Sequence, residues 1–169
     1  CVDLNFEMNL NDLAQDYIKK IKYNAKKNLK IAQRYDFKIQ ECSSLEDIKA
    51  AYSIIQRNRQ TKGYPLRMTE EQVLETMEVV LSKMYIVSLD EKSYAAALIY
   101  EVTDDVAQVI YWGDIVECSE KRVMNYLAYE LVKIYKNKGF LYLDIGPSTE
   151  NGLPNYGLCS FKDSIGCTR

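Results

Sequence analysis

The chain has 169 residues, of which 47% are hydrophobic and 27% are charged, and its 22 Lys and Arg against 24 Asp and Glu leave a net charge of −2. This composition predicts a single globular domain over residues 1–169 with a sizeable core, and so small a net charge gives no overall attraction to nucleic acid or membranes. The chain contains no histidine. That absence excludes Ser-His-Asp and Cys-His nucleophiles and most catalytic zinc or non-haem iron sites, so we expect no metal.

The sequence predicts a soluble, cytoplasmic protein. Its longest uncharged apolar run, Tyr94–Tyr100, is far shorter than the roughly 20 residues that span a bilayer. The first residues lack the basic start and apolar core of a secretory signal. Five cysteines, odd in number and without a C-x-x-C pair, indicate reduced thiols rather than a disulfide framework. They are Cys1, Cys42, Cys118, Cys159 and Cys167.

Residues 1–35 read as a basic amphipathic segment ahead of a core of residues 36–169. Apolar residues recur at steps of three and four from Leu10 to Ala32 and predict one long helix, about Asn11–Arg34. Its other face is rich in lysine, and Asp12 and Asp16 are the only acids in the range. Such a face either binds tRNA, an anionic lipid-linked sugar or membrane headgroups, or is only solvated; the net charge argues against nucleic acid.

A short strand over Phe37–Cys42 and a helix capped by Ser43 or Ser44 come next. We expect the buried face of that helix to consist of Ala50, Ala51, Ile54 and Ile55. The helix ends at Gly63-Tyr64-Pro65, because proline cannot continue it. Around this end lies a cluster suited to carboxylate or phosphate recognition, with a solvated surface run as the alternative. Its members are Arg57, Arg59, Lys62, Tyr64 and Arg67.

Thr69 begins a capping box that predicts a helix through about Ser82. Its inward residues are expected to be Val73, Met77, Val80 and Leu81. The apolar period then changes to two, which predicts an antiparallel meander of three strands. These strands are Lys83–Leu89, Tyr94–Val102 and Val106–Trp112.

The remaining elements complete a mixed sheet. Ser119 is expected to cap a helix that stops at Lys138-Gly139, followed by a strand over Phe140–Ile145 and a short helix around Lys162. Antiparallel hairpins followed by a strand-helix-strand crossover predict an α/β (α+β) fold, with a largely antiparallel sheet and helices on both faces.

Together with this element order, four motifs resemble the C-terminal half of Fem-type and related acyltransferases, which belong to the GNAT-like acyl-CoA N-acyltransferase fold. The motifs are Tyr23–Ala32, Tyr111-Trp112-Gly113, Tyr142–Gly146 and Gly157–Gly166 with Phe161-Lys162. The resemblance implies transfer of an acyl or aminoacyl group to an amine. The donor is acyl-CoA in most of the fold, a co-substrate rather than a tightly bound cofactor, and aminoacyl-tRNA in the Fem branch.

The chain departs from this pattern in two places. Where GNAT enzymes carry the pyrophosphate loop Arg/Gln-x-x-Gly-x-Gly/Ala, it reads Asp114–Arg122, without a glycine pair. The expected cofactor contacts there are Ser119, Lys121 and Arg122 at a helix N-terminus. Two further strands also usually follow the short helix in this fold. The chain is therefore a fragment, a reduced single-domain relative, or a protomer whose sheet a partner completes, as in a homodimer.

Several residues are candidates for chemistry. The resemblance assigns Lys162 to the phosphates of a nucleotide-linked substrate, whereas a lysine that only snorkels is the alternative. Asp144 either orients an amine and accepts its proton, or caps the next turn. Tyr111, beside Trp112 in the substrate site, and Tyr156 are the candidate acids or bases, although tyrosines more often pack in the core. We expect Asp144 and Lys162 at the lip of one cleft.

The sequence thus predicts an N-acyltransferase acting on the amino group of a small molecule, a sugar or a cell-envelope precursor. One alternative is a non-catalytic binding or assembly domain that has kept the fold. Another is half of a larger two-domain Fem-type enzyme whose site is completed in trans.

Overall fold

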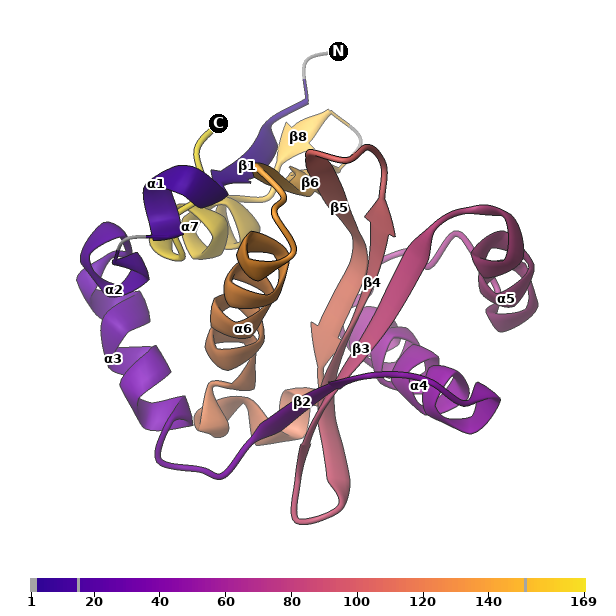
Figure 1. Ribbon diagram of the computed structural model, residues 1–169. Coiled ribbons are helices and arrows are strands. Elements are labelled where there is room, and N and C mark those ends of the chain that lie inside the picture. Colours follow the sequence, from indigo (N-terminus) through magenta and orange to yellow (C-terminus); the bar gives the residue numbers. More distant parts are fainter. Residues whose placement is uncertain (1–2, 15, 151) are drawn as a thin grey trace.

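The computed structural model describes residues 3–14, 16–150 and 152–169. A mixed six-stranded sheet separates two layers of helices (Figure 1). The strands are β1 (Asn5–Asn9), β2 (Lys38–Glu41), β3 (Ser82–Leu89), β4 (Lys92–Glu101), β5 (Val106–Asp114) and β6 (Tyr142–Pro147). The helices are α1 (Leu10–Ala14), α2 (Tyr17–Lys20), α3 (Tyr23–Ala32), α4 (Leu45–Lys62), α5 (Glu70–Val79), α6 (Val123–Asn137) and α7 (Tyr156–Ser164). A 3-10 helix, η1 (Val116–Lys121), precedes α6, and a small hairpin, β7 (Thr149–Glu150) with β8 (Leu153–Pro154), precedes α7.

The strand order is β1-β6-β5-β4-β3-β2, and β2 to β5 pair antiparallel with their chain neighbours. This confirms the predicted fold class and the meander. The only parallel pairing in the described sheet joins β5 to β6, and it covers three residue pairs, ending at Gln108 and Asp144. Beyond that point β5 continues to Asp114, paired with β4, and β6 continues to Pro147, paired with β1, but β5 and β6 no longer pair with each other, so the two strands part. Ile110 also has no partner on β4, and this β-bulge bends β5 just past the separation.

Strand β1 was missed by the sequence analysis. Its fully buried Phe6 and Met8 alternate with exposed neighbours, and it pairs antiparallel with β6. The place in the sheet beside β6 is therefore filled by this chain itself. On the other edge of β1, the amide of Glu7 donates to the carbonyl of Thr168 at 3.0 Å, and the amide of Thr168 donates back at 2.8 Å.

The prediction of one long helix over Asn11–Arg34 is wrong, because that segment forms α1, α2 and α3. Asp16 caps α2 by accepting from the amide of Lys19, and Lys22 has an extended backbone before α3. The apolar period continues across both breaks because α1 and α3 each pack against α6. A periodicity argument cannot detect a break when successive helices bury the same side.

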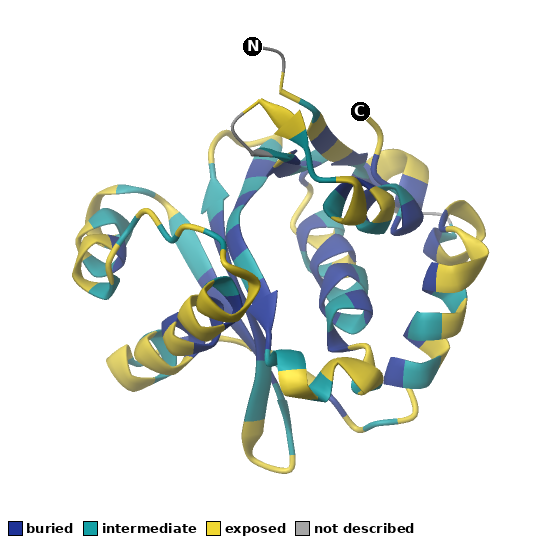
Figure 2. Ribbon diagram, turned by 180° about the vertical axis from the view of Figure 1, so that it is seen from behind, coloured by how far each residue is buried: buried dark blue, intermediate teal, exposed yellow. Residues whose placement is uncertain are grey.

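Helices α4 and α5 cover the opposite face of the sheet (Figure 1). Figure 2 shows the buried residues of α4 turned toward the strands and its exposed residues turned outward. Ser44 caps α4 with a capping box, and Gly63 ends it in the left-handed conformation at φ 69°. Of the four residues expected on the buried face, Ala51, Ile54 and Ile55 are buried, whereas Ala50 is exposed.

Helix α5 begins with the predicted Thr69 capping box but ends earlier than expected. Val80 already has an extended backbone, and the residues from Ser82 onward join β3. As a result Leu81 is 64% exposed rather than inward. The prediction for Ser119 is also wrong: it lies inside η1, and the residue before α6 is Arg122, in the left-handed conformation at φ 57°.

Two apolar cores flank the sheet. The larger joins β1, β6 and the inner sides of α1, α3, α6 and α7, and it includes Phe6, Leu127 and Ile165. The smaller lies under α4 and α5 and includes Ile55 and Tyr111. Helix α7 thus packs on the α6 side, next to the place where β5 and β6 part.

Candidate functional site

The second half of β5, the end of α4 and the helix α7 meet where β5 and β6 separate. We call this place the α4–α7 junction. Its residues are Arg59 in the last turn of α4, Tyr64 in the loop after α4, Tyr111 and Trp112 on β5, and Asn155 and Phe161 at α7. Four of the six, Arg59, Tyr64, Tyr111 and Trp112, were predicted as site residues from the sequence.

Arg59 covers Tyr111. The guanidinium carbon of Arg59 lies 5.5 Å from the centre of the Tyr111 ring, a cation–π distance. Tyr111 directly follows the bulge at Ile110 and is buried in the core under α4. Its ring is therefore fixed from below by apolar packing and from above by a cation.

Trp112 points to the other side of β5, because successive residues of a strand face opposite ways. Its ring meets that of Phe161 edge to face, with ring centres 6.0 Å apart. On the α4 side, the Tyr64 hydroxyl accepts a 2.7 Å hydrogen bond from the Asn155 side-chain amide. The side-chain oxygen of Asn155 caps α7 by accepting from the amide of Leu158. The junction thus ties the loop after α4 to the first turn of α7.

Asn58 and Asp114 form a buried clamp that the sequence analysis did not identify. The Asn58 amide nitrogen donates to the Asp114 carbonyl at 2.7 Å and to its carboxylate at 2.8 Å. A Cβ on the intervening Gly113 would lie 2.8 Å from the Cβ and Cγ of Asn58. Glycine at this position therefore lets α4 approach β5 closely enough for the clamp to form. Only the glycine after Trp112 hinted at this approach.

Lys162 is buried rather than open to a cleft. Its side chain is 2% exposed, and its ammonium donates to the carbonyls of Ile145, Gly146 and Pro147 at 3.1, 2.8 and 3.0 Å. Burial lowers the pKa of this ammonium from 10.5 to about 8, although the negative charge of Asp144 acts in the opposite direction. The positive charge of Arg59 lowers this pKa further, which places the guanidinium within electrostatic reach of Lys162.

Asp144 is also fully engaged. One carboxylate oxygen accepts from the side chain of Asn5 at 3.1 Å and from the amide of Gly146 at 2.7 Å, and the other accepts from Gln108 at 2.8 Å. The bond to Gly146 is the turn-capping interaction that was the alternative reading of this residue. Asp144 and Lys162 were expected at the lip of one cleft, but Lys162 is buried, and the two side chains instead hold opposite ends of one residue, Gly146, whose φ of 74° suits glycine.

The other members of the basic cluster around α4 lie outside the junction contacts. Arg57 pairs with Glu117 of η1 at 2.7 Å, and Lys62 lies 3.6 Å from the carboxylate of Asp114. The backbone amide of Glu117 and the Arg57 guanidinium hold the pKa of the Glu117 carboxyl below its usual value. Arg67 is exposed. These contacts attach α4 to the turn that follows β5.

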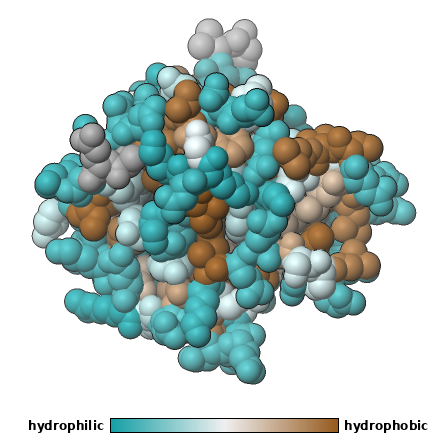
Figure 3. Space-filling model, viewed as in Figure 1, coloured by the Kyte–Doolittle hydropathy of each residue, from teal (hydrophilic) through white to brown (hydrophobic). Residues whose placement is uncertain are grey.

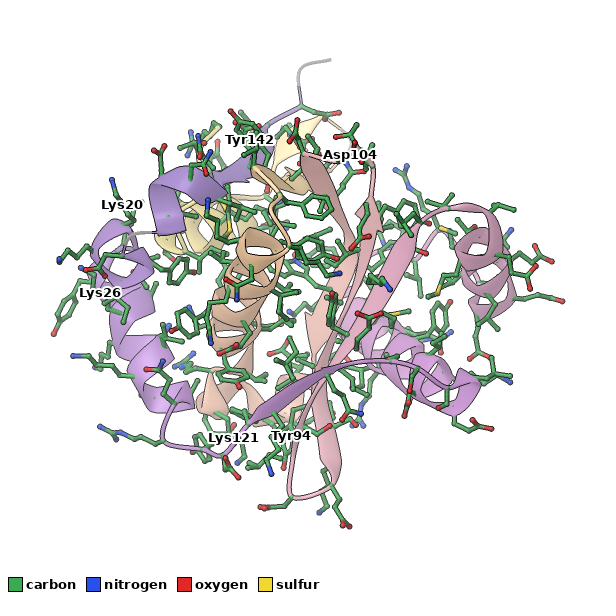
Figure 4. All side chains as sticks on the ribbon, viewed as in Figure 1. Lys20, Lys26, Tyr94, Asp104, Lys121 and Tyr142 are labelled. Atoms are coloured by element: carbon green, nitrogen blue, oxygen red, sulfur yellow. The ribbon has the colours of Figure 1, made fainter. Side chains whose placement is uncertain are left out.

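The residues expected to hold a CoA pyrophosphate lie on or just after η1. Ser119 and Arg122 are exposed, whereas Lys121 pairs with Glu120 at 3.3 Å and lies over the ring of Tyr35 at 5.2 Å. Figure 4 shows Lys121 close to Tyr94, at the end of the molecule opposite Tyr142. Tyr156, a candidate acid or base, is 79% exposed on the first turn of α7.

Two surface hollows lie elsewhere, and none of the predicted site residues lines them. One of about 480 Å³ is bordered by acidic residues, including Asp36, Asp47 and Asp90, and the other of about 430 Å³ lies at α1 and α2.

No helix within the described ranges is both long and apolar enough to cross a bilayer. The four cysteines in the described part of the chain are free thiols, and Cys1 lies outside it.

Comparison with known proteins identifies the fold. No protein-family model matches the sequence, and no curated protein sequence matches it significantly. Solved structures do match: FemX, with a TM-score of 0.83 at 10% identity, covers 99% of this chain and 60% of its own. L-PGS from Bacillus licheniformis matches with a TM-score of 0.69 at 14% identity over 98% of this chain and 57% of its own.

A GNAT family acetyltransferase from Elizabethkingia anophelis, determined with acetyl-CoA bound, matches with a TM-score of 0.57 at 13% identity. That match covers 75% of this chain and 72% of the acetyltransferase. The chain spans less than two thirds of the length of FemX and of L-PGS. The protein has the GNAT-like fold that FemX and L-PGS share with GNAT acetyltransferases, as the sequence resemblance predicted.

Proposed function

We propose that the protein transfers an acyl or aminoacyl group to an amino group, and that the reaction takes place at the α4–α7 junction. The observation that carries this proposal is the separation of β5 from β6 immediately beside Arg59 and Tyr111. Where the strands part, the carbonyls of β6 are held by Lys162, whereas the side chains adjoining β5 offer a cation and a hydroxyl. The same fold supports acetyl-CoA binding in the Elizabethkingia enzyme.

The chemistry needs no histidine. The amine nitrogen attacks the donor carbonyl, a C–N bond forms, and the C–S bond of a thioester or the C–O bond of an aminoacyl ester breaks. A base takes the proton that the amine loses, and an acid protonates the leaving group. We assign the role of the acid that protonates the leaving group to the Tyr111 hydroxyl. Arg59 binds the phosphates of the donor, because a guanidinium suits phosphate oxygens. Tyr156 and Asp144 remain the candidates on the amine side.

Lys162 takes a positioning part in this proposal. Its three donors are used by consecutive carbonyls at the end of β6, so the ammonium fixes the backbone where β6 leaves β5. Together with Asp144 it sets the direction of the turn at Gly146. In this proposal Arg59, rather than Lys162 as expected from the sequence, binds the phosphates of the donor.

The donor is a CoA ester or an aminoacyl-tRNA, and the acceptor is the amine of a small molecule, a sugar or a cell-envelope precursor. The 3-10 helix η1 stands where GNAT enzymes have a glycine-containing loop, which favours the aminoacyl-tRNA donor. Two acids of η1, Glu117 and Glu120, are paired with Arg57 and Lys121, and this pairing reduces their repulsion of phosphate in the CoA version. If the chain is half of a larger enzyme, its partner half completes the acceptor side.

The test is amide formation from labelled acetyl-CoA or from a mixed pool of labelled aminoacyl-tRNA, in the presence of an amine mixture. We expect Tyr111→Phe to lower the turnover number by roughly 100-fold or more, the usual contribution of a general acid. Tyr129→Phe is the matched control, because Tyr129 lies on α6 against Tyr17. Equal turnover by the wild-type protein and Tyr111→Phe would remove Tyr111 from the reaction.

A non-catalytic binding or assembly domain is the second candidate. The observation that favours it is the complete engagement of Asp144 and Lys162 by groups of this chain. Titration calorimetry with acetyl-CoA and with aminoacyl-tRNA separates the two candidates. Absence of heat with both donors supports the non-catalytic one.

A further inference from the structure

Charge is distributed very unevenly along this chain. Seven of its 22 Lys and Arg fall between Lys19 and Arg34, a segment without Asp or Glu. The rest of the chain therefore carries 15 basic residues against 24 acidic ones. A nearly neutral protein with one strongly basic segment has a large dipole, which orients it toward a negatively charged surface.

The structure places six of these seven cations on one outer surface, and the seventh, Lys19, pairs with Asp16. We call this surface the α2–α3 basic face, and it consists of Ile18, Lys20, Lys22, Tyr23, Lys26, Lys27, Lys30 and Arg34. In α3 the steps from Tyr23 to Lys27 and Lys30 are four and three residues, which is one stripe of a helix, and Arg34 lies in the turn that follows α3. The opposite stripe of α3, with Ala25 and Leu29, is buried in the α6-side core.

The figures show the same arrangement. Lys20 and Lys26 extend outward from α2 and α3, away from the body of the molecule (Figure 4). In Figure 3 this side of the molecule is mostly hydrophilic, whereas hydrophobic residues gather on the opposite side near α5. The face is therefore an outer rim of the protein, and its helix is anchored by the core.

The charges of the face are not balanced within the described part of the chain. Two acids flank the segment along the sequence: Asp16 pairs with Lys19 at 2.8 Å, and Asp36 pairs with Lys38 at 3.7 Å. The hydrogen bond from Lys19 and, to a smaller extent, the charge of Lys26 lower the pKa of the Asp16 carboxyl. No ion pair joins the other cations of the face to an acid among the residues that the structure describes. The repulsion among these cations is therefore reduced only by water and salt ions or by an anionic partner that binds the face.

Two apolar side chains stand among the lysines. Tyr23 is 82% exposed and Ile18 is 41% exposed. A tyrosine at this position can enter the headgroup region of a bilayer with its hydroxyl in water, as tyrosines at membrane interfaces do. Lysine stems around it can bury their methylenes and keep their ammonium groups at the phosphates.

We propose that the α2–α3 basic face docks the protein on an anionic membrane surface. A planar surface meets only the basic rim, whereas the net negative remainder of the molecule stays in water. Six of the seven cations between Lys19 and Arg34 are lysines, which attract diffuse headgroup charge, whereas bidentate recognition of nucleic-acid phosphates favours arginine. The inference does not depend on the proposed reaction.

The experiment is sedimentation of the protein with vesicles of phosphatidylcholine, alone or mixed with about one third phosphatidylglycerol. We expect binding to the mixed vesicles, weak binding to phosphatidylcholine alone, and strong weakening by salt within the range that shortens the Debye length severalfold. Each lysine at the surface is worth about fivefold in affinity, equivalent to about 1 kcal/mol. Lys26→Glu with Lys30→Glu should therefore lower the affinity by roughly 25-fold or more.

The matched control is Lys49→Glu with Lys92→Glu, which changes the net charge equally at two exposed lysines outside the face. Tyr23→Ser tests the aromatic part and should weaken binding several-fold without altering the net charge. Equal loss in the control and face variants, or equal binding to both vesicle types, would overturn the proposal. So would tighter binding to a tRNA pool than to mixed vesicles with the same sensitivity to the Lys26 and Lys30 changes. The wild-type salt series gives an answer even if a variant fails to fold.

Discussion

The buried ammonium of Lys162 makes the stability of the protein depend on pH in a definite direction. Its pKa is lowered from 10.5 in the unfolded chain to about 8 in the folded one, chiefly by burial. Between these two values the unfolded state binds more protons than the folded state, so the free energy of unfolding rises with pH. Well below pH 8 both the folded and the unfolded state hold the proton of Lys162. The free energy of unfolding is then lowered by the full cost of burying the charged ammonium.

The size of the effect follows from the same two values. The full penalty for burying the charged form is about 3 kcal/mol, at 1.36 kcal/mol for each pKa unit. About 2 kcal/mol of it is relieved between pH 7 and about pH 9.5, where the folded protein holds Lys162 neutral and most unfolded chains still carry the charge. Removing the ammonium with Lys162→Met abolishes this dependence.

The assay is urea unfolding of the wild-type protein and Lys162→Met at pH 7 and about pH 9.5. We expect the difference in the free energy of unfolding, wild type minus variant, to increase by about 2 kcal/mol at the higher pH. Cys167 lies within electrostatic reach of Lys162, but burial raises the pKa of its thiol to about 12 in the folded state, so the folded protein keeps that proton at both pH values. Lys92→Met, at an exposed lysine, is the control and should show no such change.

A pH-independent difference between the wild-type protein and Lys162→Met would refute the reasoning. It would mean that the ammonium is solvated rather than held by the carbonyls of β6. Lys162 would then be open to a ligand, and the phosphate-binding assignment would return from Arg59 to Lys162.

Three further predictions concern stability. Gly113→Ala should destabilise the protein by about 1–3 kcal/mol, because the new Cβ would displace Asn58; its control, Gly157→Ala, meets nothing closer than 3.6 Å, and a similar urea midpoint for both would contradict the clamp. Ser44→Ala should lower the free energy of unfolding by about 1 kcal/mol through loss of the capping box, and an unchanged thermal midpoint would argue against that cap. Phe6→Ala should cost about 3–5 kcal/mol if β1 is part of the core, whereas a loss below 1 kcal/mol would mean that β1 is not docked.

The sequence predicted the elements whose signals are local. The Ser44 and Thr69 caps and the strands β3, β4 and β5 depend on neighbouring residues, and all are present. Only β5 alternates in burial, because the central residues of β3 and β4 are buried on both faces of the sheet. Strand β1 was missed although its signal is also local: Leu4, Phe6, Met8 and Leu10 alternate with polar residues, which is the period of a strand. Only its pairing with β6 could not be predicted from that pattern.

Errors in the helices had a related cause. The breaks before α2 and α3 do not interrupt the apolar period, because α1 and α3 pack against the same helix. The capping signal of Asp16 was available, yet it was interpreted only as a charge. Local capping thus outweighs periodicity where helices are short.

The residues that make up the α4–α7 junction could be singled out in type from the sequence, but their contact partners could not. The aromatic and basic residues of the junction were found because Tyr111-Trp112-Gly113 and the α4 cluster stand out in the sequence. That Arg59 lies over Tyr111, or that Asn58 holds Asp114, depends on contacts about 50 or more residues apart along the chain. The burial of Lys162 under three carbonyls depends on the turn at Gly146, which no spacing rule describes.

Steady-state kinetics of two variants test the central claim, transfer at the α4–α7 junction, most directly. With labelled acetyl-CoA or aminoacyl-tRNA as donor, Arg59→Ala should raise the donor KM by tenfold or more with a smaller effect on kcat, because it removes a phosphate contact. Tyr111→Phe should lower kcat at nearly constant KM. Wild-type kinetics in both variants, on either donor, would contradict the account and place the reaction outside the junction.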